Sequence, residues 1–400
     1  MKILLVHNHY QRVGGEDETV ADEEYLLRSH GHAVIKYEQH NDAIRDLGSL
    51  ELGSKTLWNS AAYGELRQLI RRERPDVLHA HNLFPLISPA IYYAAGAEGV
   101  PVIQSLHNYR LLCVGGMLSR DGRPCEVCTR KTLPWPGVWH RCYRDRAHSL
   151  AIAAMLTLHW GLRTWQRRVR TFIALTDFAR SKLVQSGLPP EQIVVKPNFV
   201  PTDPGIGAGA GGYALYVGRL SPEKGIGTLL TAWQGLEGMP RLLVVGEGPM
   251  RPETPMPAHI QFLGQLPRAE VYRLMREASF VVVPSEVYET FGRVAVEAFA
   301  AGTPVLAAKI GALAEIVSDG RTGLVFAPGN PEDLRRKALS LFQARDRLAA
   351  MRQQARAEFE RKYTSELNYG MLLHIYERAR RDAATTSGAA CPHDGAEMLS

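Results

Sequence analysis

The sequence predicts an α/β protein built from two doubly wound domains, each a parallel sheet with helices on its faces. Short apolar runs alternate with helical stretches along most of the chain, which is the pattern of parallel strands joined by crossover helices. Residues 196–212 are rich in proline and glycine, separate two such series and have the composition of a linker. The length of 400 residues suits two or three domains.

The expected elements follow one another in this order along the chain. In the first series the expected strands are residues 3–7, 33–37, 77–80, 102–106 and 171–175. The expected helices between them are residues 17–29, 61–72, 147–168 and 177–185. In the second series the expected strands are residues 213–217, 242–245, 260–263, 280–283, 305–307 and 324–326.

These elements divide the chain into four expected parts. The first domain covers residues 1–200 and contains a cysteine-rich insert at 110–146, and the second domain covers residues 201–363. We expect residues 364–382 to form a helix that crosses back to the first domain. From residue 383 to residue 400 the chain is small and polar, which predicts a disordered tail.

Composition excludes several classes of protein. With 45% hydrophobic and 22% charged residues, the chain is neither disordered, fibrous nor a disulfide scaffold. No segment approaches the 18–20 apolar residues, roughly, of a membrane span, and residues 1–7 resemble a buried strand more than a signal peptide. Five cysteines, an odd number, agree with the cytoplasmic location that we expect.

The net charge of +6 lies in the first half of the chain. Residues 1–200 hold 25 basic and 19 acidic side chains, and residues 101–200 hold 15 basic and 5 acidic ones. Such an excess suits phosphates, nucleic acid or an anionic membrane surface, and charge alone does not choose among them.

Two loops that follow strands suit the binding of phosphates. Gly14 and Gly15 precede a helix, where backbone N–H groups can bind an anion, although a plain turn is the alternative. This loop lacks the G-x-G-x-x-G spacing of a nicotinamide site. In the second domain, Gly218 is followed by Arg219 and Lys224, two cations that could bind a diphosphate. The alternative for that loop is a solvated basic turn.

A pair of carboxylates follows the expected strand at 280–283. Glu289 lies just before a helix, and Glu297 lies eight residues later, about two turns inside that helix. Spaced in this way, the two acids can accept hydrogen bonds from hydroxyl groups at and beside the helix end. The alternative is an ordinary helix with a favourable acid at its start.

These motifs together resemble the retaining glycosyltransferases of family 4. That family has the GT-B fold, in which two Rossmann-like domains face each other across a cleft. The resemblance spans most of residues 1–380. It rests on the E-x7-E motif, the Arg-Lys pair, the first glycine loop and two turns at 245–249 and 262–264. One departure is the run 311–315, where the family usually has Gly-Gly-x-Pro-Glu.

The resemblance implies a donor site for a UDP- or GDP-linked sugar in the second domain. Glu297 would bind the ribose and Glu289 the sugar, while Leu266 would lie near the base. Arg219 and Lys224 would neutralise the departing diphosphate, and the absence of Asp-x-Asp agrees with catalysis without a metal. The expected catalytic residues are His107, Glu289, Arg219 and Lys224. The expected donor-binding residues are Gly14, Gly15, Gly218, Leu266, Phe291, Gly292 and Glu297.

Three histidines lie at strand ends of the first domain. His107 matches the family histidine that faces the transferred sugar, whereas a histidine at a strand end is otherwise more often structural. His79 and His81 place both rings on one side of a strand, as metal ligands can. The sequence offers no third ligand, so packing is their expected role.

The activity expected from the resemblance is transfer of a hexose-type sugar to a hydroxyl group of a glycan or lipid-linked saccharide. Cell-surface or exopolysaccharide synthesis is the expected setting. No covalent nucleophile is evident, so we expect front-face substitution with retention of configuration. A GT-B nucleotide-sugar epimerase is the nearest alternative.

Four cysteines in the insert suggest a structural zinc site. Cys113, Cys125, Cys128 and Cys142 combine one C-x2-C pair with a flanking cysteine on each side, which is the ligand count of a four-thiolate zinc site. Four reduced thiols and an iron–sulfur cluster are the alternatives. A zinc-stapled basic module that binds nucleic acid is a further rival. Residues 101–200 lack the interleaved aromatic and basic residues of such modules, so we expect no nucleic-acid partner.

The expected helix at 147–168 suggests peripheral contact with the inner face of the cell membrane. Trp160 and Trp165 would form a patch on this helix with four arginines: Arg163, Arg167, Arg168 and Arg170. A solvated basic face is the alternative.

Overall fold

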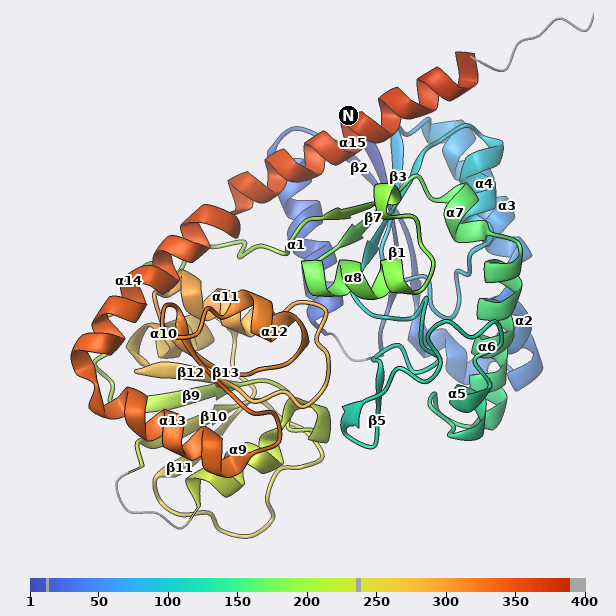
Figure 1. Cartoon of the computed structure of the whole chain (residues 1–400). Coiled ribbons are helices and arrows are strands. Elements are labelled where there is room, and N and C mark those ends of the chain that lie inside the picture. The colour runs from blue at the N-terminus through green and yellow to red at the C-terminus, as the bar shows by residue number, and fades with distance from the viewer. Residues whose placement is uncertain (12–13, 235–238, 389–400) are drawn as a thin grey trace, which may run out of the picture.

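The structure is a computed structural model, and it describes residues 1–11, 14–234 and 239–388 (Figure 1). The first domain contains a six-stranded sheet in which every neighbouring pair is parallel. Its strands, in spatial order, are β2 (Ala33–His40), β1 (Lys2–His9), β3 (Val77–Ala80), β4 (Val102–Leu106), β7 (Thr171–Ala174) and β8 (Ile193–Val195).

The second domain repeats this architecture with a second parallel sheet of six strands. Its strands, in spatial order, are β11 (Ile260–Gly264), β10 (Arg241–Val245), β9 (Tyr213–Val217), β12 (Phe280–Val283), β13 (Val305–Ala308) and β14 (Gly323–Phe326). The chain order reverses between β9 and β12, as in a Rossmann fold, and loops at such a switch point commonly bind ligands.

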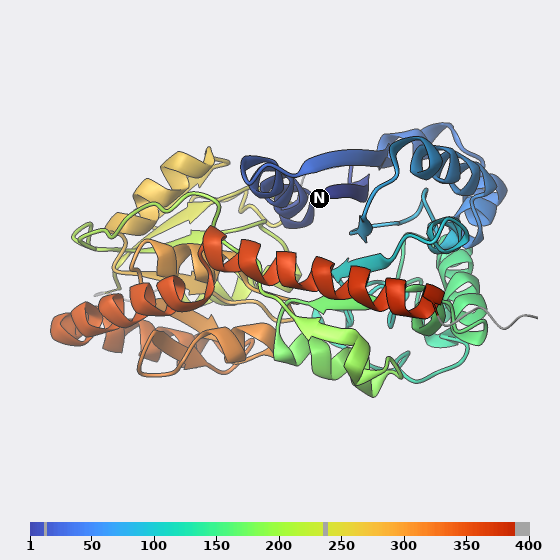
Figure 2. The ribbon, with the colours of Figure 1, turned by 90° about the horizontal axis from the view of Figure 1, so that it is seen from above.

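Helices cover both sheets (Figures 1 and 2). In the first domain they are α1 (Gly15–Ser29), α2 (Ser49–Leu57), α3 (Ser60–Glu73), α4 (Ala90–Ala97), α5 (Trp135–Trp139), α6 (Arg146–Gly161), α7 (Thr164–Arg168) and α8 (Asp177–Gln185). In the second they are α9 (Ile226–Trp233), α10 (Arg268–Glu277), α11 (Arg293–Ala300), α12 (Gly311–Ile316), α13 (Pro331–Gln343) and α14 (Arg345–Lys362). The central strands β3, β4, β7, β12 and β13 are buried along their whole length, because both faces of each sheet are covered.

The last helix, α15 (Ser365–Gly388), returns from the second domain to the first (Figure 2). At the crossing, the N–H of Val200 donates to the carbonyl of Tyr363 at 3.1 Å, so the outgoing and returning segments lie side by side. Beyond this point, Leu372 and Tyr376 of α15 pack with Ile3 and Leu5 of β1 in one buried cluster. The stretch 372–379 of this helix therefore completes the core of the first domain.

Three expectations differ from the structure. The helix expected at 147–168 breaks at Arg163, which has a φ of 54°, and the buried Thr164 hydroxyl then bonds His159 at 2.9 Å. Trp165 is 0% exposed and Trp160 donates to a backbone carbonyl, so neither belongs to the expected membrane patch. The terminal helix continues to residue 388, beyond the expected start of the tail at 383, and residues 389–400 lie outside the described residues.

Among the described residues, no helix is both long enough and apolar enough to cross a bilayer.

The packing of α15 yields a stability prediction. Leu372→Ala should lower the free energy of unfolding by about 2–5 kcal/mol, because it opens a cavity in the buried cluster beneath α15. Leu367→Ala on the same helix is the matched control, since this side chain is 43% exposed, and its effect should stay within about 0.5 kcal/mol. Urea denaturation measures both. Equal effects would contradict the docking of α15.

Candidate active site

Loops at the carboxyl ends of the strands of both domains line one cleft. The cleft has a volume of about 840 Å³, part of it open to solvent. The first domain contributes Gly15 and Glu16 after β1 and His107 and Asn108 after β4, and the second contributes Lys224 after β9. Glu223 lies beside Lys224 in this wall, and the loop after β12 supplies residues 287–292 and Arg293.

An ion pair joins two loops of the second domain that line the cleft. Lys224 Nζ lies 2.9 Å from Glu289 Oε1, and the hydroxyl of Ser285 donates to the same carboxylate. Gly225 permits this approach: its φ is 69°, and a Cβ there would lie 1.8 Å from the carbonyl oxygen of Pro284. Desolvation raises the pKa of Glu289, but the ammonium of Lys224 outweighs it and the net pKa is lowered. Glu289 is therefore ionised and placed beside a cation.

Arg293 connects Glu297 with the first domain. Arg293 Nε donates to Glu297 Oε1 at 3.0 Å, and the same guanidinium bonds Asp22 of α1 at 2.7 Å. Arg268 also reaches Asp22, at 3.0 Å. Glu297 is buried, and desolvation raises its pKa in spite of Arg293. This ion-pair cluster holds α11 against α1, beside the Gly14-Gly15 loop.

His107 lies where the two domains touch. Its Nε2 is 3.0 Å from Nδ1 of His81, and its carbonyl accepts a hydrogen bond from the hydroxyl of Thr290 at 2.8 Å. The hydroxyl of Thr176, also in the first domain, donates to the carbonyl of Thr290 at 3.1 Å. Desolvation lowers the pKa of His107 to about 3. The imidazole facing the cleft is therefore neutral at physiological pH.

Behind His107 lies a buried network that includes the histidine pair. Glu23 Oε1 lies 3.0 Å from Nδ1 of His79 and 3.6 Å from Nε2 of His81, so the structure supplies the third potential metal ligand that the sequence did not reveal. Lys196 Nζ is 3.3 Å from the same carboxylate, and Tyr376 of α15 bonds His79 at 2.7 Å. An ammonium therefore already balances the charge of Glu23 within this buried network.

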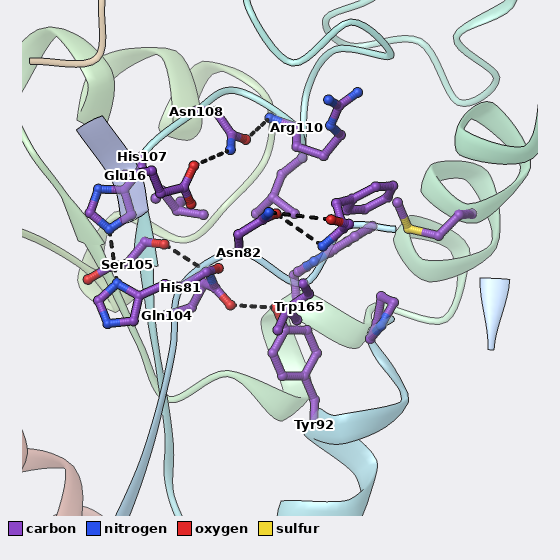
Figure 3. A pocket seen from close by; sticks show the side chains of 16 residues that line it. Glu16, His81, Asn82, Tyr92, Gln104, Ser105, His107, Asn108, Arg110 and Trp165 are labelled. Atoms are coloured by element: carbon purple, nitrogen blue, oxygen red, sulfur yellow. Dashed lines mark hydrogen bonds between the residues drawn. The ribbon is translucent and has the colours of Figure 1, made fainter. Parts of the chain in front are cut away.

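A second pocket of about 440 Å³ lies in the first domain, next to the cleft (Figure 3). Glu16, His107 and Asn108 line both cavities, so they stand at the junction between them. The deeper walls are largely apolar: Leu83, Phe84, Leu106, Leu111, Met155 and Trp165. The N–H of the buried Trp165 indole has no hydrogen-bond partner among the described residues.

Glu16 is the acid at this junction, and the sequence analysis did not single it out. Its carboxylate accepts hydrogen bonds from the hydroxyl of Tyr10 at 2.9 Å and from the amide of Asn108 at 3.3 Å. Desolvation raises its pKa. Its position after the glycine loop was the only available signal, because its partner Asn108 is 92 residues away.

Two family models match this chain, one on each domain. Residues 27–204 match the model described as Glycosyltransferase Family 4, and residues 209–358 match Glycosyl transferases group 1. The chain belongs to the family-4 type of glycosyltransferases. The resemblance given by its motifs is thereby confirmed.

Solved structures confirm the GT-B fold of this glycosyltransferase. HepE of Anabaena, in complex with UDP and glucose, is 18% identical with a TM-score of 0.65, over 94% of this chain and all of that one. A sucrose-phosphate synthase from Thermosynechococcus elongatus is 16% identical with a TM-score of 0.70, over 95% of this chain and 99% of that one. At these identities the likeness shows the fold alone.

Two curated relatives have higher sequence identity to this chain than these solved structures, and each matches over part of its length. A sulfoquinovosyl transferase of Arabidopsis thaliana is 33% identical over 84% of this chain and 65% of its own length. A phosphatidyl-myo-inositol mannosyltransferase of Mycobacterium leprae is 32% identical over 54% of this chain and 61% of its own. The chain thus spans less than two thirds of these relatives.

The cleft of this glycosyltransferase gathers some of the expected site residues and not others. Gly15, His107, Lys224, Glu289, Phe291 and Gly292 line it together. Five others do not line it: Gly14, Gly218, Arg219, Leu266 and Glu297. Arg219 is instead paired with Glu223, its neighbour on the same loop. Glu315, from the departing 311–315 run, accepts from the N–H groups of Asp177 and Phe178 and so caps α8 of the first domain.

The four cysteines of the insert are free thiols in one region of the first domain. A short hairpin of β5 (Ser119–Arg120) and β6 (Arg123–Pro124) precedes the C-x2-C turn. Within the described residues, no three of the four sulfur atoms lie within 4.8 Å of one another. Desolvation and the neighbouring thiols raise the pKa of Cys128 to about 11. The insert brings the cysteines near each other without closing a tetrahedral site.

The histidines beside the cleft predict acid sensitivity. Because desolvation lowers the pKa values of His81 and His107 below the ordinary value of about 6.5, the unfolded chain binds protons that the folded chain does not. This contribution to stability is complete above about pH 6.5 and is lost as the pH falls towards 3. The melting temperature should therefore decrease on acidification from about pH 6.5 to 5, before most carboxylates titrate. The dependence of melting temperature on pH should become weaker in His107→Asn and stay unchanged in the surface control His140→Asn. An unchanged dependence in His107→Asn would contradict the prediction.

Proposed function

We propose that this protein is a retaining glycosyltransferase that moves a hexose-type sugar from a UDP- or GDP-linked donor to a hydroxyl group of a glycan or lipid-linked saccharide. The observation that carries the proposal is the Lys224–Glu289 pair, which faces His107 across the cleft between the two sheets. Membership of the family supports it, and UDP and UDP-glucose occupy the structurally similar HepE. The setting that we propose is cell-surface or exopolysaccharide synthesis.

The donor lies over the loops of the second domain in this proposal. Lys224 compensates the negative charge that grows on the diphosphate as it departs, and Glu289 accepts hydrogen bonds from hydroxyl groups of the sugar. The side chain of Arg219 is 59% exposed, so it can leave Glu223 and bind the diphosphate together with Lys224. Glu297 binds the ribose, and Arg293 holds its carboxylate in place. In this scheme the two cations supply the charge compensation and no metal ion is required.

The acceptor enters from the first domain. Glu16 and Asn108 bind the acceptor near its reacting hydroxyl, and the second pocket receives the adjoining part of the molecule. Substitution takes place on one face of the sugar. The acceptor oxygen bonds to the anomeric carbon as the bond from that carbon to the phosphate oxygen breaks, and the departing phosphate oxygen accepts the hydroxyl proton. The neutral imidazole of His107 packs beside the sugar without repelling the positive charge that develops on it.

Variants of the ion pair test this proposal. Lys224→Ala and Glu289→Gln should each lower kcat at least about 100-fold, because each removes a charge or hydrogen bond that acts where charge develops. Lys337→Ala, on α13 outside the cleft, is the control and should turn over at the wild-type rate. A panel of UDP-, GDP-, ADP- and dTDP-sugars, read by thermal shift and by product formation, identifies the donor. Near-wild-type turnover in both variants contradicts the proposal, and sugar conversion without acceptor indicates the epimerase instead.

We also propose that the cysteine insert binds a structural zinc ion. The C-x2-C turn follows a hairpin, and the backbone N–H of Gly137 bonds the sulfur of Cys128, as amides commonly do at zinc thiolates. Desolvation, and after it the repulsion of neighbouring thiolates, raises the pKa values of Cys128 and Cys142, and a bound divalent cation offsets that repulsion. Small movements of these loops bring four sulfurs to about 2.3 Å from the metal.

Metal analysis tests the zinc site. Protein purified without chelator should contain stoichiometric zinc, and the double variant C125S/C128S should lose it together with several degrees of melting temperature, because a ligand bound to the folded state stabilises it. Cys391→Ala, which changes the one cysteine outside the insert, is the control and should keep the metal. Wild-type protein without zinc, or with iron in its place, contradicts the assignment.

A further inference from the structure

Exposed apolar side chains are concentrated in one part of the first domain. Among the described residues, 16 large hydrophobic side chains are exposed, and eight of them fall within residues 117–162. Since isolated exposed hydrophobics are normal on any surface, it is this clustering that calls for a partner.

Six of these eight lie on α5, on α6 or next to them: Leu133, Trp135, Trp139, Leu150, Leu158 and Leu162. We call this set the α5–α6 face. On α6, Leu150 and Leu158 lie eight residues apart on one side of the helix, and Leu162 follows one turn later. On α5, Trp135 and Trp139 are four residues apart and also share a side.

Two contacts join the helices into one surface. The hydroxyl of Thr157 on α6 donates to the carbonyl of Thr132, next to Leu133, at 3.1 Å. At the other end of α6, the guanidinium of Arg146 lies over the ring of Trp139, 5.3 Å from its centre. In Figure 1, α5 and α6 lie on the side of the first domain away from the second domain. The α5–α6 face is thus clear of the cleft and of the domain contact.

The chain segment that builds this face is strongly basic. Between residues 127 and 170 there are nine basic side chains and one acid, Asp145. The carboxylate of Asp145 accepts from the N–H of His148 and caps α6. All nine basic residues are exposed: Arg130, Lys131, Arg141, Arg144, Arg146, Arg163, Arg167, Arg168 and Arg170. Two of them have partners beyond α5 and α6, because Arg170 pairs with Asp382 and Arg168 lies over the ring of Tyr93.

We propose that the α5–α6 face docks this protein on an anionic lipid bilayer. Tryptophan and leucine side chains on an amphipathic surface partition into the interface between headgroups and acyl chains, and flanking arginines bind the phosphates. A purely apolar protein partner would not account for the basic residues of the segment that builds the face, whereas a negatively charged leaflet does. This surface differs from the patch expected from the sequence, because its tryptophans are Trp135 and Trp139 and not Trp160 and Trp165.

The position of the α5–α6 face relative to the cleft connects membrane docking with access of the acceptor. The same insert that contains α5 also supplies Gly116 and Met117 to the wall of the cleft. If the acceptor is lipid-linked, a point that rests on the proposed function, docking brings the first-domain side of the cleft towards its headgroup. The docking itself needs no turnover, so it can be tested separately.

Vesicle flotation tests the docking surface with the full chain. Wild-type protein should float with vesicles of phosphatidylcholine mixed with phosphatidylglycerol and not with phosphatidylcholine alone, and rising salt should weaken the binding. The double variants W135A/W139A and R141E/R144E should each bind the anionic vesicles at least about tenfold more weakly. Their thermal unfolding should match wild type, because these side chains are exposed.

Matched controls carry the same changes elsewhere. L367A/M371A on α15 removes two exposed apolar side chains, and R345E/R347E on α14 reverses two exposed charges; both should bind as wild type. Absence of wild-type binding to anionic vesicles, or equal binding by the four variants, overturns the proposal. So does light scattering that shows a dimer of this chain disrupted by W135A/W139A without any vesicle binding. Loss of transfer activity with vesicle binding intact would count against the proposed function alone.

Discussion

The bridge that Arg293 makes between Glu297 and Asp22 is the contact on which the cleft most depends. The Arg293 side chain is only 15% exposed, so solvent screens its ion pairs with the two carboxylates poorly. Removing one partner would leave a buried charge without compensation, which is strongly destabilising. Arg293 fixes α11 of the second domain against α1 of the first. With the domains held so, Thr290 reaches both His107 and Thr176, and the carboxyl ends of the two sheets face each other.

Within this frame, neighbouring groups have opposite electrostatic environments. Glu289 stays ionised because Lys224 offsets its desolvation. Among the described residues no cation lies at hydrogen-bond distance from Glu16, and desolvation raises its pKa. His107 is kept neutral by desolvation. Titratable groups pushed in different directions within one cleft are typical of sites that manage charge during a reaction. The wall from the second domain holds a paired cation and carboxylate, whereas the junction with the second pocket holds a carboxylate whose pKa is raised, so the two sides of the cleft differ in electrostatic character.

Local pattern was enough to find the residues that follow strands. Gly15, Lys224, Glu289 and His107 each stand just beyond a strand end, and parallel sheets bring such ends to one edge. Local pattern was not enough for residues whose role depends on a distant partner. Glu23 became the companion of His79 and His81 only through folding, and the break at Arg163 depends on the burial of Thr164 beneath it.

The sequence by itself determined the α/β class, the division into two sheets and the family, because strand periodicity and loop motifs are local properties of the chain. Only the tertiary structure decided which surface is free. Trp165 and Trp139 belong to the same basic stretch, yet one is fully buried and the other is 61% exposed. That difference arises from how α5, α6 and α7 pack on the first sheet, and packing is set by contacts between segments far apart in the chain.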